Sequence, residues 1–362
     1  MQVFVNGSFL ALYPVTGLSR YALSMSQALQ EHFGDQMTIL APPVIRINSD
    51  LTKLNIEKVG SSYKRLFWEQ WDLPNYLNKI HSPLLVNFGN TAPISYSNQI
   101  VSILDIFYYH VKQIVGDEHK LYPWFDKKFY KFLIKSIAKN SKAIITISNY
   151  SKQDISSTLN INTNKINVVY PNISDFFLNN HEIVLPNARP YEEEYILGVS
   201  SVTPHKNFRS LIAAYHQANL VDNRLVIVGN MPTELKIGSF NKDKIIFTGY
   251  IDDVQLKKLY QNAKLFAYPS KFEGFGIPPL EAMACGCPTL VSNVASLPEV
   301  CGKGSYYVDP SKIDSIAQGL VALNSDSALR QKLIVEGFNR LPLFSKSVSS
   351  KRLVEVVERY LS

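Results

Sequence analysis

The sequence predicts an α/β protein of two domains, each built on a parallel sheet, and three observations support this. Short apolar runs alternate with helical patterns along the whole chain, as expected when crossover helices join parallel strands. The 362 residues are enough for two domains of ordinary size. Residues 185–194 contain two prolines and an acidic run, so this stretch is the best linker candidate.

The apolar runs place the strands in order along the chain. In the first half they are Val3–Val5, Met37–Leu40, Leu84–Phe88, Ile100–Leu104, Ala143–Ile147 and Asn167–Tyr170. In the second half they are Tyr195–Val199, Leu225–Val228, Ile245–Thr248, Lys264–Tyr268 and Thr289–Ser292. We therefore expect an N-terminal Rossmann-like domain over 1–184, the linker at 185–194, a C-terminal Rossmann-like domain over 195–342 and a final segment at 343–362.

Helical periodicity is clear in three places. An amphipathic helix opens around Gly17, and another follows Asn207, where apolar residues recur at i, i+3, i+4 and i+7 over 208–215. The last helix is expected at Ser349–Leu361, which has one apolar face. Asn207 is a good N-cap by residue type, and Asp252 is favoured as the N-cap of the helix that follows it.

Composition restricts the class of protein. Hydrophobic residues make up 46% and charged residues 19%, which is typical of a folded globular chain. The chain has no run of 18 apolar residues and no basic residue before Arg20, so we expect neither a transmembrane helix nor a signal peptide. The three cysteines lack metal or redox spacing, which favours a reducing cytoplasm. Without an Asp-x-Asp, Walker-type or complete dinucleotide motif, we expect no metal and no other cofactor.

The basic charge has several explanations. The formal net charge is +7 and the pI is near 9.0, which suits nucleic acid, an anionic membrane or anionic small substrates. Eight lysines lie in residues 112–142, interleaved with aromatic residues. This mixture suits a membrane interface, and an ordinary solvated helix with aromatic residues in the core explains it about as well. No nucleic-acid motif is present, so no nucleic-acid partner is expected.

The stretch from Glu273 to Glu281 is the most informative chemical pattern. Gly274 and Gly276 have no Cβ, so a ligand can approach their backbone N–H groups. The double proline at 278–279 suits the first positions of a helix. We expect Glu281 in the first turn of that helix, where N–H groups and the dipole favour a phosphate. On its own, a glutamate in a first turn is more commonly just a dipole partner.

A second anion-binding pattern follows the predicted strand Tyr195–Val199. Lys206 stands at the N-terminus of the next helix, where its ammonium group adds to the dipole and can hold a diphosphate. The plain alternative is an exposed surface lysine. His205 is mostly neutral at pH 7, and Arg209, one turn further on, is a candidate to supply the missing charge.

These patterns resemble the signature of the retaining, GT-B-fold glycosyltransferases of family 4, whose hallmark is two glutamates separated by seven residues. Glu273 and Glu281 have that spacing, and the resemblance extends over nearly the whole chain. It implies two facing Rossmann-like domains with a deep interdomain cleft. It also implies a nucleotide diphosphate sugar as donor and a last helix that crosses back to the first domain.

The resemblance assigns the donor side residue by residue. Glu273 contacts the donor sugar in this family, Glu281 binds the ribose, and the Gly-Phe-Gly backbone lies against sugar and diphosphate. Lys206 matches the family's Arg-Lys-Asn pattern, although His205 replaces the arginine. The expected donor-binding residues are Gly17, His205, Arg209, Gly229, Tyr250, Gly274, Phe275, Gly276, Leu280 and Glu281, and the expected catalytic residues are Glu273, Lys206 and Asp105.

The N-terminal half is expected to bind the acceptor through Asn90, Thr91, Leu104 and Ser148, although a polar loop at a strand end explains the first two about as well. Relatives carry His-Asp where this chain has Leu104-Asp105, which fits either a loss of catalysis or a different donor. Burying a sugar 6-hydroxyl against leucine would cost about 1–3 kcal/mol. We therefore hypothesise a 6-deoxyhexose donor.

We expect a cytoplasmic, retaining glycosyltransferase that moves a sugar, of 6-deoxyhexose or mannose type, to a growing glycan or polyprenyl-diphosphate-linked acceptor. The pathway would be O-antigen, capsule or exopolysaccharide synthesis, with peripheral contact to the inner membrane through residues 112–142. In this family the leaving phosphate can take the acceptor's proton, so positioning and electrostatics supply most of the catalysis. The alternatives are a catalytically silent sugar-nucleotide-binding or scaffold subunit, or a GT-B sugar-nucleotide epimerase.

Overall fold

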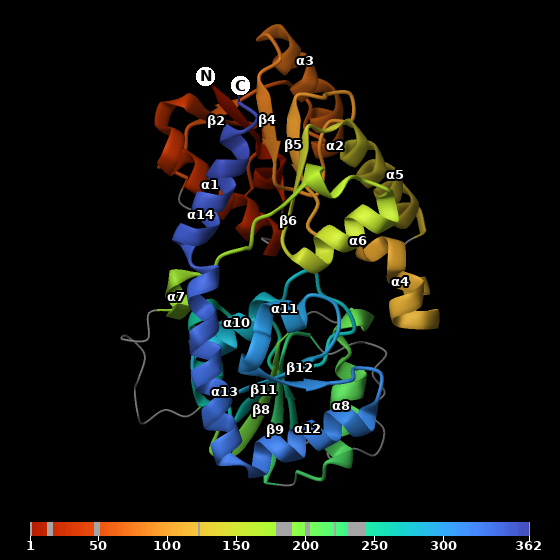
Figure 1. Ribbon diagram of the computed structural model, residues 1–362, viewed down its shortest axis with the longest axis vertical. Helices are drawn as coiled ribbons and strands as arrows, with labels where there is room; N and C mark the ends of the chain where they lie inside the picture. Colours follow the sequence, from red (N-terminus) through yellow and green to blue (C-terminus); the bar gives the residue numbers. More distant parts are fainter. Residues whose placement is uncertain are drawn as a thin grey trace. The chain divides into compact units, whose positions relative to one another are not determined.

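The computed structural model describes residues 2–12, 17–46, 51–121, 124–178, 190–199, 203–220, 222–230 and 244–361. The chain forms two compact units (Figure 1). Unit 1 comprises Met1–Tyr109, Lys120–Pro171 and Ser347–Ser362, and unit 2 comprises His110–His119 and Asn172–Lys346. The sequence placed the division at 184 and the return at 343, and residues 185–189 of its predicted linker lie outside the described residues.

Unit 1 holds a parallel sheet of seven strands in the order β3-β2-β1-β4-β5-β6-β7. The strands are β1 Val3–Asn6, β2 Met37–Ala41, β3 Ile56–Lys58, β4 Leu84–Asn87, β5 Gln99–Ser102, β6 Ala143–Thr146 and β7 Ile166–Val168. Most are continuous apolar runs, because helices cover parallel sheets. The sequence predicted every strand of this sheet except β3, which is short and largely exposed and has no apolar run.

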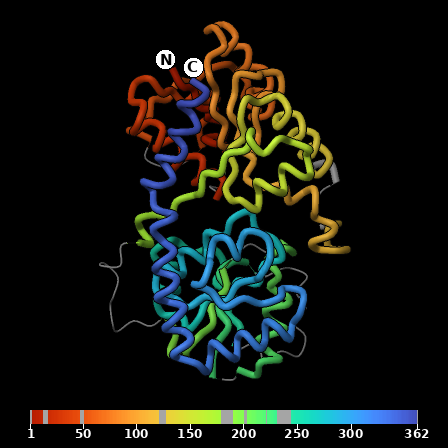
Figure 2. Tube along the Cα trace, viewed as in Figure 1, coloured from red at the N-terminus to blue at the C-terminus, as the bar shows by residue number. Residues whose placement is uncertain are grey.

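Helices connect these strands and pack on them. They are α1 Gly17–Phe33, α2 Arg65–Phe67, α3 Leu73–Lys79, α5 Trp124–Asn140, α6 Asn149–Leu159 and α14 Lys346–Glu358, with a π-helical turn, η3, at Trp68–Asp72. Helix α4, Phe107–Val115, begins in unit 1 and continues into unit 2 from His110. One core cluster joins α5 and α6 to the strands, and a second joins Trp68 and α3 to them. The chain returns to unit 1 through α14 (Figure 2), where His32 of α1 lies 3.0 Å from Glu358.

Unit 2 repeats the architecture with six parallel strands in the order β10-β9-β8-β11-β12-β13. They are β8 Glu194–Val199, β9 Asn223–Val228, β10 Ile245–Phe247, β11 Leu265–Tyr268, β12 Thr289–Ser292 and β13 Ser305–Val308. The sequence predicted all but β13, whose middle residues, Tyr306 and Tyr307, are only partly buried. The two sheets confirm the predicted α/β class.

The helices of unit 2 follow the expected alternation. They are α7 Asp175–Leu178, α8 Phe208–Gln217, α9 Asp253–Asn262, α10 Ile277–Ala284, α11 Leu297–Cys301, α12 Ile313–Ser325 and α13 Ser327–Arg340, with a 3-10 turn, η7, at Pro204–Lys206. The predicted apolar face of α8 is buried in one core cluster with α12 and the sheet. Asp252 caps α9 as predicted, since its Oδ1 accepts the Gln255 N–H at 2.7 Å.

All three cysteines of the chain lie in unit 2, and none forms a disulfide. Cys285, Cys287 and Cys301 are 8%, 2% and 0% exposed. Burial raises the pKa of the Cys285 and Cys301 thiols to about 12. It raises the pKa of Cys287 well above its ordinary value too, so all three are packing residues.

Candidate functional site

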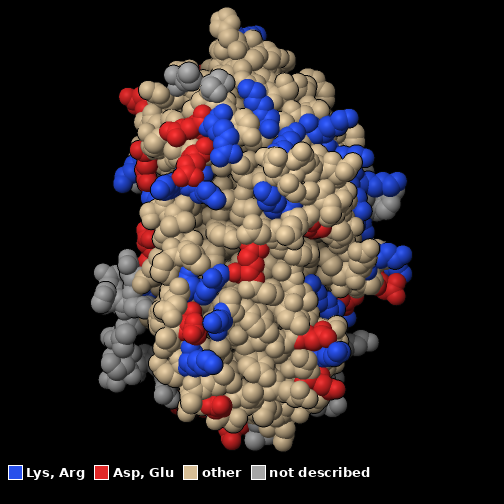
Figure 3. Space-filling view, viewed as in Figure 1, with Lys and Arg blue, Asp and Glu red and all other residues tan. Residues whose placement is uncertain are grey.

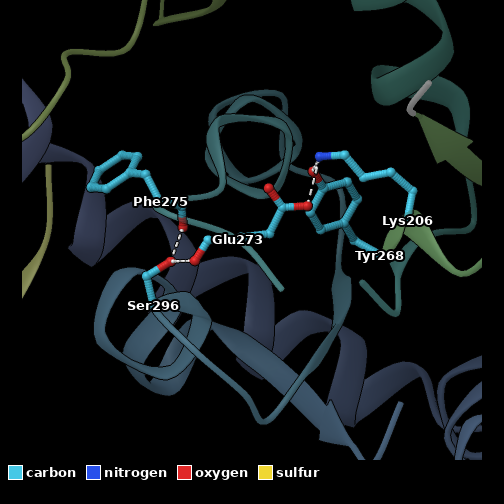
Figure 4. A network of polar contacts seen from close by, with 5 residues as sticks. All are labelled: Lys206, Tyr268, Glu273, Phe275 and Ser296. Atoms are coloured by element: carbon cyan, nitrogen blue, oxygen red, sulfur yellow. Dashed lines mark hydrogen bonds and ion pairs between the residues drawn. The ribbon is translucent and has the colours of Figure 1, made fainter. Parts of the chain in front are cut away.

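The best-defined polar site of unit 2 lies at the carboxyl ends of β8 and β11. These strands are parallel neighbours, so the segments that follow them emerge at the same edge of the sheet. Lys206 ends η7 after β8, and Glu273 lies in the loop after β11. The Lys206 Nζ is 2.7 Å from the Glu273 Oε1 and 3.1 Å from the hydroxyl of Tyr268 (Figure 4).

The Lys206–Glu273 pair is sheltered from water. The side chains are 17% and 11% exposed. Burial alone would raise the pKa of the Glu273 carboxyl, but the charge and hydrogen bonds of Lys206 and Tyr268 outweigh it and hold the pKa below its ordinary value. The same contacts raise the pKa of Lys206 despite its burial. Both groups are therefore ionised at neutral pH, with a fixed cation held beside the strand ends.

The loop that carries Glu273 is held in one conformation by side chains from elsewhere in unit 2. The Ser296 hydroxyl lies 2.8 Å from the carbonyl oxygens of Glu273 and of Phe275, and donates to either (Figure 4). The Phe275 ring is 3% exposed and packs edge-on against Phe344, with centroids 5.5 Å apart. Phe275 can therefore meet a ligand only through its backbone.

Gly276 makes the turn into α10. Its φ is 107°, and a Cβ there would lie 2.7 Å from the Leu297 Cδ2, so only glycine fits without strain. Pro278 and Pro279 have no N–H, so the amide donors at the helix start come from Gly276 and Ile277. These amides and the helix dipole make this turn suitable for a phosphate.

The expected place of Glu281 in the first turn of this helix is wrong. α10 begins at Ile277, one residue before the prolines, because Gly276 takes the N-cap position, and no acidic residue lies in the first turn. Glu281 is in the second turn, where its Oε2 accepts a hydrogen bond from the buried Tyr260 hydroxyl at 3.2 Å. The side chain of Leu280 is fully buried and therefore, like that of Phe275, cannot contact a ligand.

Asn207 has a different role from the predicted one. It holds the N-cap position of α8 with a φ of 63°, but its side chain makes no cap hydrogen bond. Instead its amide, 4% exposed, donates to the carbonyl oxygens of Pro269 at 2.9 Å and Pro310 at 2.8 Å. Long-range backbone acceptors thus take the donors of this side chain and fix the loop that precedes Glu273.

The residues beside Lys206 add no second cation to the pair. Burial and, to a smaller extent, the charge of Lys206 lower the pKa of His205 to about 4, so His205 is neutral at pH 7. The Arg209 guanidinium is 53% exposed and pairs with Glu118 at 3.0 Å. Among these residues, Lys206 is therefore the cation that contacts Glu273.

Gly229 and Gly249 form a short antiparallel bridge at the ends of β9 and β10. Their backbone groups exchange hydrogen bonds of 3.0 and 3.2 Å. Gly229 has a φ of 137°, a conformation that favours glycine. Tyr250 follows the bridge with 85% of its surface exposed, which leaves its ring open to stack on a planar ligand group.

In unit 1, three of the predicted acceptor residues meet at the ends of β4 and β5. The Asn90 Oδ1 accepts the Leu104 N–H at 2.8 Å, and the Leu104 side chain is 9% exposed. The Thr91 hydroxyl donates to Glu69 at 2.9 Å and accepts from Arg65 at 3.3 Å. The polar side chains of Asn90 and Thr91 therefore already have hydrogen-bond partners within unit 1.

The remaining predicted residues of unit 1 have structural partners as well. The Asp105 Oδ1 accepts the Phe107 N–H at 3.0 Å, at the start of α4. Ser148 is fully buried and caps α6 by accepting the Ser151 N–H at 2.9 Å. Gly17 is the first residue of α1, with open space around its Cβ position.

Sequence reasoning missed four residues that hold these sites together, namely Tyr268, Ser296, Tyr260 and Glu69. The first three orient Glu273, its loop and Glu281, and Glu69 orients Thr91. Tyr268 ends a predicted strand next to the motif, which was a usable signal. The others act across 21 to 23 residues, where no local pattern marks the partner.

This chain is similar to proteins described as glycosyl transferases. Residues 181–340 match the family described as glycosyl transferases group 1. The chain is 29% identical over 322 residues to O-antigen chain mannosyltransferase RfbU of Salmonella typhimurium, covering 82% of this chain and 83% of that protein. It is 27% identical over 369 residues to O-antigen chain mannosyltransferase B of Escherichia coli, covering 92% and 93%.

A solved structure shows the same fold. The crystal structure of WaaG, a glycosyltransferase involved in lipopolysaccharide biosynthesis, matches with a TM-score of 0.74 at 16% identity, covering 98% of this chain and 99% of that one. The two parallel-sheet units thus have the GT-B fold. The family match over residues 181–340 and the two mannosyltransferase relatives agree with the family resemblance that the motifs predicted.

The described residues contain neither a metal-ligand cluster nor a membrane-spanning helix. No three histidine, cysteine or carboxylate side chains in that part of the chain gather as a metal ion would require. None of the helices in the described ranges has the length and apolar character needed to cross a bilayer.

Proposed function

We propose that this glycosyltransferase moves a hexose from a nucleotide diphosphate sugar to a growing glycan, with retention of configuration and without a metal ion. The observation that carries the proposal is the Lys206–Glu273 pair beside the amides of Gly276 and Ile277. A sheltered cation and a helix start together suit a diphosphate, and the adjacent carboxylate suits sugar hydroxyls.

The chemistry follows from these groups. Lys206 and the turn amides would neutralise the charge that develops on the departing nucleotide diphosphate. The leaving phosphate would accept the proton of the attacking hydroxyl on the same face, so no separate base is needed. Glu273 would orient the donor sugar, Glu281 the ribose, and the exposed Tyr250 ring would stack on the base.

Mannose is the first donor sugar to test. The curated relatives reported above are named as O-antigen chain mannosyltransferases, which favours a mannosyl donor and an O-antigen or related surface glycan. Leu104 favours the second choice, a 6-deoxyhexose, because its buried side chain offers a methyl group apolar contact and a hydroxyl none. Asn90, Thr91, Ser148 and Asp105 of unit 1 are the proposed acceptor contacts.

The acceptor is proposed to be a polyprenyl-diphosphate-linked glycan, met by peripheral contact with the cytoplasmic face of the inner membrane. On α5 the core residues are aliphatic, whereas Phe129 is 38% and Phe132 is 61% exposed. Lys128 and Lys135 are exposed on the same helix. Lysine and arginine side chains gather over this edge of unit 1 (Figure 3), and aromatic and basic residues together suit an anionic interface. The side chains at 121–126 lie outside the described residues.

The test is transfer by purified protein. Candidate nucleotide diphosphates are first ranked by thermal shift, because a bound ligand raises apparent stability. GDP-mannose and GDP-fucose are then supplied with octyl α-mannopyranoside as acceptor, and NMR of the product gives the anomeric configuration. Glu273→Ala is expected to abolish transfer, and EDTA is expected to leave it unchanged. An inverted product, or loss of activity in EDTA, would contradict the mechanism.

The second candidate is a silent sugar-nucleotide-binding or scaffold subunit, favoured by Leu104 and by the neutral His205. It predicts nucleotide binding without transfer or hydrolysis, which the same assay detects. Conversion of the donor sugar in the absence of any acceptor would instead identify a sugar-nucleotide epimerase.

A further inference from the structure

Glu69 is a fully buried carboxylate in unit 1 that the proposed chemistry does not use. Three neutral donors converge on its Oε1, from Asn6 at 2.8 Å, Ser8 at 3.0 Å and Thr91 at 2.9 Å. Its Oε2 is buried and has no hydrogen-bond partner among the described residues. The described part of the chain also gives it no ion pair, since Arg65 reaches Thr91 instead.

Such a residue is expensive to keep in a folded protein. An unpaired carboxylate removed from water costs several kcal/mol unless hydrogen bonds compensate, and here one oxygen lacks them. An apolar residue of similar size would fill the same space at lower cost. The turn that carries Glu69 is also unusual, because Trp68–Asp72 is π-helical, a rare conformation that is frequent at functional sites.

Gln70, the neighbour of Glu69, is hydrogen-bonded to the loop of residues 90–94 that contains Thr91. The Gln70 Nε2 donates to the Ala92 carbonyl oxygen, and its Oε1 accepts the Ile94 N–H, both at 3.0 Å. Glu69 holds Thr91, which precedes Ala92 and Ile94 in the same loop. The two adjacent residues of the π-helical turn thus fix the side chain or backbone at three positions in residues 90–94.

The strands locate this loop. Asn6 ends β1, and residues 90–94 follow β4, which pairs with β1 in parallel. The hydrogen bonds of Glu69 therefore join two segments at the carboxyl edge of the sheet, the edge where open α/β sheets bind ligands. Asn90, which precedes Thr91 in this loop, in turn accepts a hydrogen bond from the backbone N–H of Leu104.

We propose that Glu69 is a positioning residue, which acts through Thr91 to hold residues 90–94 in the conformation that receives the acceptor. That the loop receives an acceptor rests on the proposed function, whereas the ordering of residues 90–94 by Glu69 does not. The negative charge of Glu69 serves to order the loop, since one carboxylate oxygen can accept three hydrogen bonds better than a neutral amide oxygen can.

The first test needs no activity. Hydrogen–deuterium exchange of the amides in 90–94 is compared in Glu69→Gln, Thr91→Val and a matched control, Ser8→Ala. Ser8 donates to the same oxygen from outside the loop. We expect exchange at least about tenfold faster in the first two and within twofold of wild type in the control. Equal effects in all three, or none in Glu69→Gln, would overturn the proposal.

The second test is kinetic, with GDP-mannose and octyl α-mannopyranoside. Glu69→Gln and Thr91→Val are each expected to raise the acceptor KM about tenfold, and Glu69→Gln is expected to leave donor hydrolysis within twofold of wild type. The double variant should match either single one, because Glu69 acts through Thr91. Multiplied effects, or an equal loss of hydrolysis, would refute positioning. A wild-type protein without transfer would refute the proposed function and leave the exchange test to decide on Glu69.

Discussion

The two units build their polar sites in opposite ways. In unit 2, Lys206 and Glu273 form an ion pair that lowers the pKa of one partner and raises that of the other, so both charges are compensated. In unit 1, Glu69 is surrounded by neutral donors, with no ion pair among the described residues. We propose that the ion pair of unit 2 presents charge to a ligand and that Glu69 of unit 1 uses its charge to hold its own loops.

The largest effect is expected from Lys206→Ala, which removes the cation of unit 2. It should lower kcat/KM at least about 100-fold by loss of charge stabilisation, and lower stability by about 3–5 kcal/mol because Glu273 stays buried and unpaired. Transfer assays and urea unfolding measure both. Lys258→Ala, at an exposed lysine of α9, is the matched control. A Lys206→Ala protein with wild-type kcat/KM would remove the distinction between the units.

The next prediction compares how well the backbone of each site tolerates a glycine-to-alanine substitution. Gly276→Ala should destabilise the protein by about 1–3 kcal/mol, because its φ is 107° and its Cβ would meet Leu297 at 2.7 Å. Gly89→Ala, in the loop after β4, should cost little, since the nearest atom to its Cβ is 3.6 Å away. Thermal unfolding of both variants measures the contrast, and equal shifts would show that the turn into α10 is no stiffer than the loop of unit 1.

Tyr268→Phe tests how much of the compensation in unit 2 comes from a neutral group. The hydroxyl lies 3.1 Å from the Lys206 Nζ, and a hydrogen bond to a charged group contributes about 1.5–3 kcal/mol. We expect kcat to fall about tenfold with little change in acceptor KM. A rise in acceptor KM alone would place Tyr268 on the acceptor side instead.

The smallest effect is on acid stability. The folded-state pKa of His205, about 4, lies below its unfolded value of about 6.5, so its contribution is complete above pH 6.5 and is lost as pH falls towards 4. At pH 5.5 the loss should be on the order of 1 kcal/mol relative to pH 7.5. Urea unfolding of His205→Gln across this range should show a shallower decline than wild type. Parallel declines would mean that folding does not lower the pKa of His205.

The sequence predicted what contiguous residues decide. Continuous apolar runs gave nearly all strands, and the residues around Gly276 and Pro278 gave the turn and helix beside the ion pair. It failed where distant partners decide. Asn207 has the chemistry of an N-cap, but its amide meets carbonyl oxygens 62 and 103 positions away. The hydrogen bonds of Glu69 likewise span up to 63 positions, and no local spacing marks them.

The three buried thiols of unit 2 can report on local unfolding through the rate at which they are chemically labelled. A sulfhydryl reagent can modify Cys285, Cys287 or Cys301 only during an excursion that brings the thiol to solvent. Cys285 borders the C-terminal end of α10, whose other end begins the proposed phosphate turn. Its labelling rate, followed by mass spectrometry, should therefore slow when a nucleotide diphosphate sugar occupies that turn, without any engineered probe.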